Sequence, residues 1–139
     1  MCSSDLLGTV LDARTAQDAI AAGAQFLVSP SLVPDVREIA RDSDMLFIEG
    51  GQTPTELRTA LASTGIAKLF PAHVGGPAYL RSFLSVAPGA KIVPTGGIPL
   101  GQIAEWLDAG AYAVGVGRDL TASGDIEARI RDLDLPVVH

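Results

Sequence analysis

Short apolar runs alternate with amphipathic stretches along most of the chain. The apolar runs are nearly continuous rather than alternating, which is typical of parallel strands with both faces covered by helices. The runs predicted to be strands are Leu7–Leu11, Gln25–Ser29, Met45–Glu49, Ile66–Phe70, Lys91–Pro94 and Ala113–Gly117. Regular alternation of strands and helices predicts an α/β fold with a parallel sheet and right-handed crossovers.

The amphipathic stretches between these runs predict helices with recognisable ends. The predicted helices are Thr15–Ala22, Pro34–Arg41, Pro54–Ala62, Pro77–Val86, Leu100–Ala109 and Asp125–Leu133. Asp12 is placed to cap the first helix, and Thr53 with Glu56 has the spacing of a capping box. Gly65 and Gly110 follow helices and suit the turn that ends many of them.

The number of strand–helix pairs restricts the architecture. Six pairs are predicted, whereas a (β/α)8 TIM barrel has eight and usually takes about 200 residues or more. The 139 residues therefore form either an open doubly wound sheet or a barrel that lacks its first two strand–helix units. The motifs described below favour the barrel, so residues 1–139 are expected to be a single, N-terminally incomplete domain with strands three to eight.

Composition narrows the classes of function. The formal net charge of -6 argues against a nucleic-acid surface, which needs clustered cations. A single cysteine, Cys2, excludes an internal disulfide and a cysteine-based zinc cluster. No apolar run reaches the roughly 18 residues of a membrane span, and the chain start lacks the pattern of a secretory signal. We therefore expect a cytoplasmic protein with no nucleic-acid or membrane partner.

One predicted strand carries a lysine, Lys68, at its centre. Burying an ammonium costs free energy because it loses its hydration, and lysines are rarely buried without a partner. Burial also lowers the pKa of an amine and so raises the fraction of free amine, which can form an imine with a ketone. The alternative, from spacing alone, is an edge-strand lysine whose charge reaches solvent. Lys91 starts its strand and is expected to be solvated.

Glycine pairs follow two consecutive predicted strands. The runs are Val93–Ile98, with Gly96 and Gly97, and Val114–Arg118, with Gly115 and Gly117. Glycines at such turns let backbone N–H groups approach a phosphate closely. In barrels the loops after strands seven and eight often form a phosphate site, which would place Lys68 on strand six. A single pair could be only a tight turn, but two in succession favour the phosphate site.

The runs Lys68–Ala72, Gly75–Leu80 and Pro94–Ile98 together resemble 2-keto-3-deoxy-6-phosphogluconate (KDPG) aldolases, whose bacterial members often also act on 4-hydroxy-2-oxoglutarate. Segments in matching order extend the resemblance: Gly8–Leu11, Gly23–Pro30 and Thr53–Glu56. The resemblance implies a class I aldolase, a homotrimeric (β/α)8 barrel that cleaves a phosphorylated keto acid into pyruvate and glyceraldehyde 3-phosphate. Lys68 would form the imine, and no metal or other cofactor is implied.

The same resemblance implies a set of substrate-binding residues. They are Thr9, Phe70, Pro71, Thr95, Gly96, Gly97, Gly117 and Arg118. Thr9 and Thr95 would lie near the pyruvate carboxylate, and the glycines and the Arg118 position would hold the phosphate.

Several positions depart from the family's pattern. The family's general-base glutamate on the second barrel strand, and an arginine after it, have no counterpart here. Glu49 stands where the family commonly has proline, His73 where it has glutamate, and Arg118 where serine is usual. Glu49 and His73 are either substitute proton shuttles or exposed loop residues. Arg118 either contacts the phosphate with two nitrogens or points to solvent.

Alternatives to the gluconate aldolase remain open at this point. A related enzyme acts on 2-keto-3-deoxy-6-phosphogalactonate, which differs in the configuration of one hydroxyl. A barrel that handles phosphorylated heterocycles such as thiamine phosphate would use similar glycine loops but would not need Lys68. From a different class of function, the chain could be a non-catalytic, phosphate-binding barrel fragment.

Overall fold

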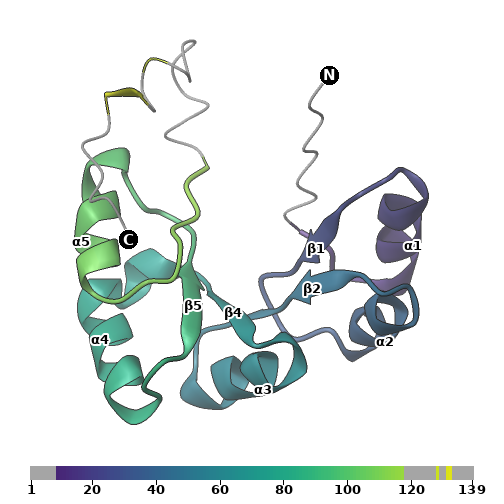
Figure 1. Ribbon diagram of the computed structural model, residues 1–139, viewed down its shortest axis with the longest axis horizontal. Coiled ribbons are helices and arrows are strands. Elements are labelled where there is room, and N and C mark those ends of the chain that lie inside the picture. Colours follow the sequence, from purple (N-terminus) through teal and green to yellow (C-terminus); the bar gives the residue numbers. More distant parts are fainter. Residues whose placement is uncertain (1–8, 118–127, 129–130, 133–139) are drawn as a thin grey trace. The chain divides into compact units, whose positions relative to one another are not determined.

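The computed structural model describes residues 9–117, 128 and 131–132. The chain divides into two compact units, one ending at Phe70 and the other beginning at Pro71. Both units contain helices and strands in alternation, which Figure 1 shows along the chain. The predicted α/β class is therefore confirmed.

The first unit consists of parallel strands joined by helices. Its elements are α1 (Ala13–Ala21), β1 (Phe26–Val28), α2 (Pro34–Asp42), β2 (Leu46–Ile48), β3 (Gly50–Gly51), α3 (Pro54–Thr64) and β4 (Ile66–Leu69). Strands β1 and β2 pair in parallel with Leu27 opposite Phe47, and β3 pairs in parallel with β4. Parallel pairing across each helical connection is the predicted βαβ arrangement.

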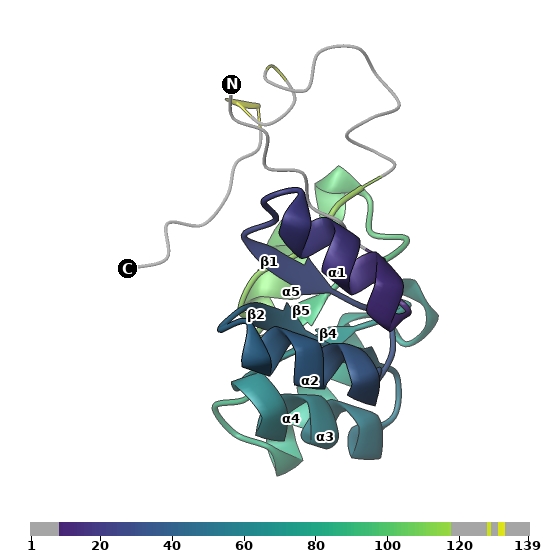
Figure 2. The ribbon, with the colours of Figure 1, turned by 90° about the vertical axis from the view of Figure 1, so that its right-hand side faces the viewer.

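Helices α1 and α2 cover the same face of the β1–β2 pair (Figures 1 and 2). The core between these layers is made of Val10, Ala16, Ala19, Leu27, Val36, Ala40 and Phe47. The small residues lie on the helices and the large ones largely on the strands, so the helices approach the strands closely. Burial of these apolar side chains is the main stabilising contribution in this unit.

The helix ends form as their capping residues predict. Asp12 accepts a hydrogen bond from the Thr15 N–H at 2.8 Å. Thr53 and Glu56 make a complete capping box, and Gly65, with φ of 79°, ends α3 in the left-handed conformation. Hydrogen bonds from the N–H groups of Thr53 and Gln52 hold the pKa of Glu56 below its ordinary value.

The second unit begins with a turn of 3₁₀ helix and contains one described strand. Its elements are η1 (Ala72–Val74), α4 (Gly76–Val86), β5 (Lys91–Pro94), η2 (Leu100–Gln102) and α5 (Ile103–Asp108). Its buried apolar side chains include Leu80, Phe83, Ile92, Ile98, Ile103 and Trp106. Lys91 is exposed, as predicted, with its amine 5.3 Å from the centre of the Tyr112 ring.

Some predicted elements differ from the structure. The segment predicted as a strand at 113–117 is not a regular strand. It forms an isolated parallel bridge between Thr95 and Gly115, and the Gly115 N–H donates to the Pro94 carbonyl at 2.9 Å. Its two glycines weaken a strand, because the unfolded chain has more backbone entropy at glycine and a glycine offers no side chain to pack. The described part of the predicted first strand, residues 9–11, is not a strand either, although Val10 donates a backbone hydrogen bond to Val28 at 3.0 Å. Leu7 and Gly8 lie outside the described residues. The predicted helix at 125–133 lies largely outside them too.

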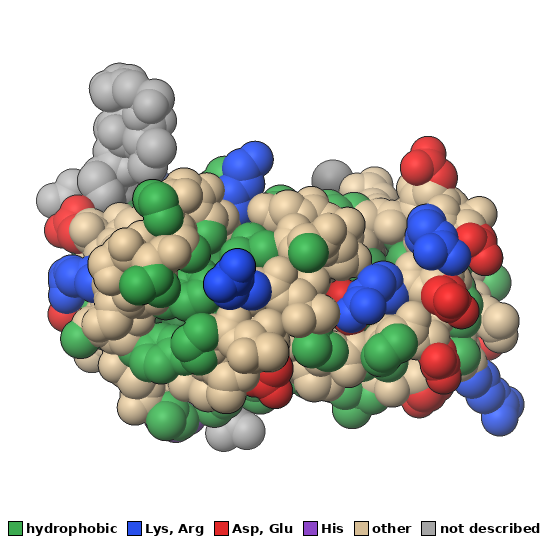
Figure 3. Space-filling model, turned by 90° about the horizontal axis from the view of Figure 1, so that it is seen from below, with side chains coloured by type: hydrophobic (Ala, Val, Ile, Leu, Met, Phe, Trp, Pro, Cys, Tyr) green, Lys and Arg blue, Asp and Glu red, His purple; other side chains and the backbone are tan. Residues whose placement is uncertain are grey.

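The surface carries charges of both signs. On the face in Figure 3, lysine and arginine side chains lie among aspartates and glutamates instead of forming a continuous basic surface. Within the described residues, no helix has the length and apolar character needed to cross a bilayer.

Replacing Thr53 by alanine is expected to destabilise the protein by about 1 kcal/mol, because the Glu56 N–H loses the hydroxyl that caps it. Urea denaturation measures this change. Thr55→Ala is the matched control, since Thr55 is exposed in the same helix and is not the capping residue. An equal decrease in the free energy of unfolding in the two variants would contradict the capping assignment.

Candidate active site

Lys68 lies on β4 with its side chain almost completely buried. The residue is 7 % exposed, and its neighbours Ala67 and Leu69 are 0 % and 1 % exposed. Residues alternate between the faces of a strand, so Lys68 points to the face opposite Ala67 and Leu69. Its Nζ lies 5.1 Å from the centre of the Phe70 ring, which belongs to the same face. The solvated edge-strand alternative is therefore wrong.

Burial changes the acid–base behaviour of this amine. Desolvation lowers the pKa of Lys68 below that of an ordinary lysine, because the charged form loses hydration. At a given pH, a larger fraction of Lys68 is therefore the free amine that attacks carbonyl groups.

The backbone of Lys68 is held by the strand segment that includes β3. The Lys68 N–H donates to the Glu49 carbonyl at 2.9 Å, and the Phe70 N–H donates to the Gly51 carbonyl at 3.0 Å. Gly50 lies opposite Lys68 in the strand register. A Cβ on Gly50 would come within 2.6 Å of the Pro30 carbonyl, so no other residue fits here without backbone movement.

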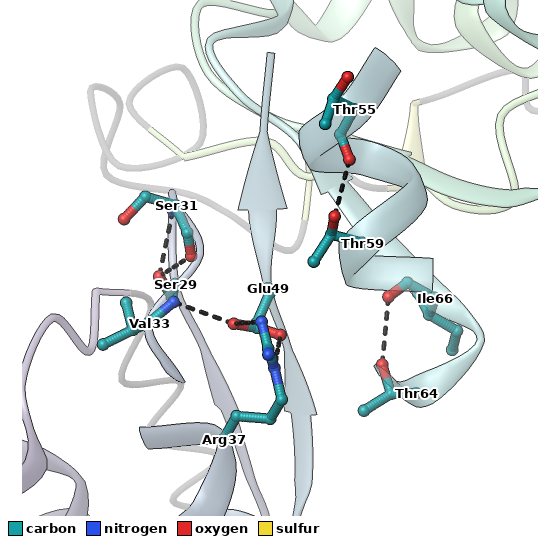
Figure 4. A network of polar contacts seen from close by, with 9 residues as sticks. All are labelled: Ser29, Ser31, Val33, Arg37, Glu49, Thr55, Thr59, Thr64 and Ile66. Carbon is teal, nitrogen blue, oxygen red and sulfur yellow. Dashed lines mark hydrogen bonds and ion pairs between the residues drawn. The ribbon is translucent and has the colours of Figure 1, made fainter. Parts of the chain in front are cut away.

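Glu49 is buried rather than exposed, which corrects one of its two sequence interpretations. Its carboxylate receives Arg37 Nε at 2.7 Å, Arg37 Nη2 at 3.0 Å and the Val33 N–H at 2.9 Å (Figure 4). This carboxylate raises the pKa of the Arg37 guanidinium. With its oxygens engaged in this way, Glu49 is poorly placed to act as a proton shuttle.

A second group of predicted site residues lies in the second unit. Gly96 and Gly97 both have positive φ, 98° and 69°, in the loop after β5. The Ala72 N–H donates to the Thr95 carbonyl and the His73 N–H to the Gly96 carbonyl, at 2.9 Å and 3.2 Å. These bonds place η1 along the loop.

His73 lies directly beside the glycine pair. A Cβ on Gly97 would come within 2.5 Å of His73 Nδ1, and the same nitrogen lies 3.4 Å from the Gly96 carbonyl oxygen. His73 is exposed, as one of its two interpretations predicted. Thr95 packs its side chain against Gly115, where a Cβ would come within 2.5 Å of the hydroxyl.

The other predicted site residues are distributed as follows. Thr9 is exposed and precedes Val10, and Gly117 is also exposed. Phe70 ends the first unit and Pro71 begins the second. Arg118 lies outside the described residues, so neither of its two interpretations is tested. Among the residues that the structure describes, no group of three or more histidines, cysteines, aspartates and glutamates could hold a metal ion.

Comparison with known proteins identifies the family. Residues 6–134 match the family described as KDPG and KHG aldolase. The chain belongs to this family. Membership in the KDPG and KHG aldolases confirms the resemblance carried by the lysine and glycine motifs, and it favours an aldolase over the barrel that handles thiamine phosphate.

Similar proteins include aldolases for two epimeric substrates. The chain is 39% identical over 102 residues to a 2-dehydro-3-deoxy-phosphogluconate aldolase of Pseudomonas aeruginosa, covering 72% of this chain and 46% of that protein. It is 33% identical over 119 residues to a 2-dehydro-3-deoxy-6-phosphogalactonate aldolase of Escherichia coli, covering 84% and 58%. The chain thus spans about half the length of the curated relatives it matches.

A solved structure of the family is similar over most of the chain. It is a KDPG aldolase from Legionella pneumophila, with pyruvate captured as a covalent carbinolamine intermediate. The TM-score is 0.76 at 30% identity, and the match covers 91% of this chain and 62% of that one. That protein therefore forms a covalent adduct with pyruvate.

Lys68→Met is expected to raise the melting temperature by a few degrees at pH 7, because methionine fills the site without a buried charge. Since burial lowers the pKa of Lys68 in the folded protein, the Lys68 amine keeps its proton to a higher pH in the unfolded chain than in the folded one. Stability of the parent therefore rises as the pH increases through the window between these two pKa values. Lys68→Met removes this rise.

Differential scanning calorimetry at several pH values measures both effects. Lys91→Met is the matched control, because Lys91 is the other lysine of the chain and is exposed. Melting temperatures that change equally in the two variants would contradict the buried position of Lys68.

Proposed function

We propose that this protein is a class I aldolase that cleaves 2-keto-3-deoxy-6-phosphogluconate into pyruvate and glyceraldehyde 3-phosphate. The observation that carries the proposal is the position of Lys68, a lysine 7 % exposed at the centre of an apolar strand. Family membership supports the same chemistry. We propose further that the chain supplies the positions of strands three to eight of a (β/α)8 barrel. The parallel strand pairs support this, and the last position would be taken by the segment that pairs with β5 through Gly115.

In the proposed reaction, the free amine of Lys68 attacks the keto carbon of the substrate. The carbinolamine loses water and becomes a protonated imine, which draws electrons from the carbon–carbon bond that breaks. A proton leaves the substrate hydroxyl as the aldehyde departs, and the remaining enamine takes up a proton. Water then hydrolyses the imine, which releases pyruvate and regenerates the amine. Charge develops on nitrogen, so the step needs no metal to polarise the ketone.

The substrate phosphate is assigned to the loop with Gly96 and Gly97. Positive φ at both glycines turns the backbone in a way that lets N–H groups face an anion. We assign Gly117 and Arg118 to the same end of the substrate, and Thr9 and Thr95 to its carboxylate. Phe70 and Pro71 follow the lysine directly and are proposed to contact the keto acid.

The galactonate epimer is a second candidate substrate, because the curated relatives include an aldolase for it. 4-Hydroxy-2-oxoglutarate, abbreviated KHG in the description of the family, is a third candidate substrate. We further propose a homotrimer in the cytoplasm, on the basis of the resemblance described above. The proposed ligand of the site is then a phosphorylated keto acid.

Borohydride reduction in the presence of pyruvate is expected to attach pyruvate covalently to Lys68 through a secondary amine. Peptide mass spectrometry locates the adduct, and Lys91 is a control within the same molecule because the chain has only these two lysines. Lys68→Arg keeps the charge but forms no imine, so it should abolish the adduct. Labelling of Lys91 alone, or equal labelling of both lysines, would contradict the proposal.

Gly97→Ala is expected to weaken binding of glyceraldehyde 3-phosphate by about tenfold, because a Cβ there meets His73 and disfavours the required positive φ. Phosphorus NMR titration measures the affinity. Gly89→Ala is the matched control, since Gly89 has φ of 78° but no atom within 4 Å of the point where a Cβ would lie. Unchanged affinity in a folded Gly97→Ala protein would remove this loop from the phosphate site.

A further inference from the structure

Glu49 is buried but has no role in the chemistry proposed above. Its side chain is 0% exposed, whereas that of its partner Arg37 is 33% exposed. The guanidinium donates to both carboxylate oxygens, and the Val33 N–H donates to one of them. These hydrogen bonds connect the end of β2 to the start of α2, as Figure 4 shows.

The main chain of Glu49 contacts the proposed nucleophile. Its carbonyl accepts the Lys68 N–H at 2.9 Å, and the next residue, Gly50, lies opposite Lys68 in the register. One residue therefore joins the helix on one side to the lysine strand on the other. Rotation of the side chain alone would leave this carbonyl in place. A shift of the Glu49 backbone, which would be needed if the carboxylate moved toward water together with its segment, would move the carbonyl that accepts the Lys68 N–H.

We propose that the Arg37–Glu49 ion pair is a positioning device for Lys68, which fixes the carbonyl that holds the lysine backbone. A two-point contact between guanidinium and carboxylate has a narrow geometry, so it restrains the residue more than a single hydrogen bond does. A buried carboxylate that loses its cation must reach water, which would displace the segment at Glu49 and Gly50. The inference rests on the proposed function only in that Lys68 is the proposed nucleophile.

A second ion pair on the same helix allows a matched comparison. Arg41 Nε lies 3.5 Å from the Asp42 carboxylate, and these side chains are 72% and 74% exposed. Exposed pairs of this kind contribute little to stability. The same substitution at Arg37 and at Arg41 therefore separates the effect of the buried pair from that of removing a positive charge from α2.

A pocket beside the ion pair allows chemical rescue. The pocket has a volume of about 320 Å³, and its lining includes Arg37, Ala40, Met45, Phe47 and Thr64. Arg37→Ala leaves room next to Glu49 for a small alkylguanidinium ion. Ethylguanidinium carries the planar donor group of arginine, whereas ethylammonium carries only the charge.

Hydrogen exchange at the Lys68 amide tests the anchoring without reference to catalysis. Arg37→Ala is expected to accelerate this exchange by about tenfold, with little change at the Ala87 amide in the second unit. Arg41→Ala is expected to change neither amide. Ethylguanidinium should slow the Lys68 exchange again, and ethylammonium should not. Uniform acceleration at all amides, or no acceleration at Lys68, would overturn the proposal.

The rate of pyruvate imine formation gives the second readout. Arg37→Ala should lower the maximal rate of imine formation by about tenfold, because the amine is displaced and not removed. The pyruvate concentration at which the rate is half-maximal should change little. Arg37→Lys, which keeps the charge and is less disruptive to folding, should lower it by a smaller factor. A parent-like maximal rate in both variants would overturn the proposal. If the parent itself forms no imine, the proposed function fails, while the exchange comparison still decides the anchoring.

Discussion

The burial of the Lys68 amine on an apolar strand is the constraint on which the candidate site depends. Lys68 is 7 % exposed, so its ammonium form is penalised and its free amine is favoured. A free amine reacts efficiently with a ketone only if its position is restrained, because the nitrogen must approach the carbonyl carbon in a defined direction. The neighbouring strand segment supplies this restraint through backbone hydrogen bonds and through Gly50, where a side chain would not fit.

The restraint extends outward from the strand to helix α2. Glu49 accepts hydrogen bonds from Arg37 and Val33 through its carboxylate, while its carbonyl accepts the Lys68 N–H. A buried ion pair is not an efficient way to gain stability, since desolvation cancels much of the attraction. Its narrow geometry is the more useful property here. The chain thus uses one buried charge pair to restrain a residue whose own charge is disfavoured.

Local signals in the sequence predicted part of this arrangement. The capping box of Thr53 and Glu56 and the strand around Lys68 follow from short-range patterns, and the structure contains both. The burial of Glu49 was not predictable, because its partner Arg37 is 12 residues away and no local pattern shows which carboxylate an arginine on that helix will meet. The strand predicted at 113–117 is reduced to a parallel bridge at Gly115, since a hydrophobic pattern does not show how much the glycines weaken pairing.

The titration of the Lys68 amine is the most direct test of its desolvation. Nuclear magnetic resonance of side-chain nitrogen-labelled lysine reports the two lysines of the chain separately, and the Lys68 signal of the same protein unfolded in urea supplies the reference. We expect Lys68 in the folded protein to lose its proton at a lower pH than an ordinary, fully hydrated lysine, because burial desolvates its ammonium form. Titration of Lys68 at the same pH in the folded and the unfolded protein would contradict this expectation, since Lys68 would then be as hydrated in the fold as an ordinary lysine.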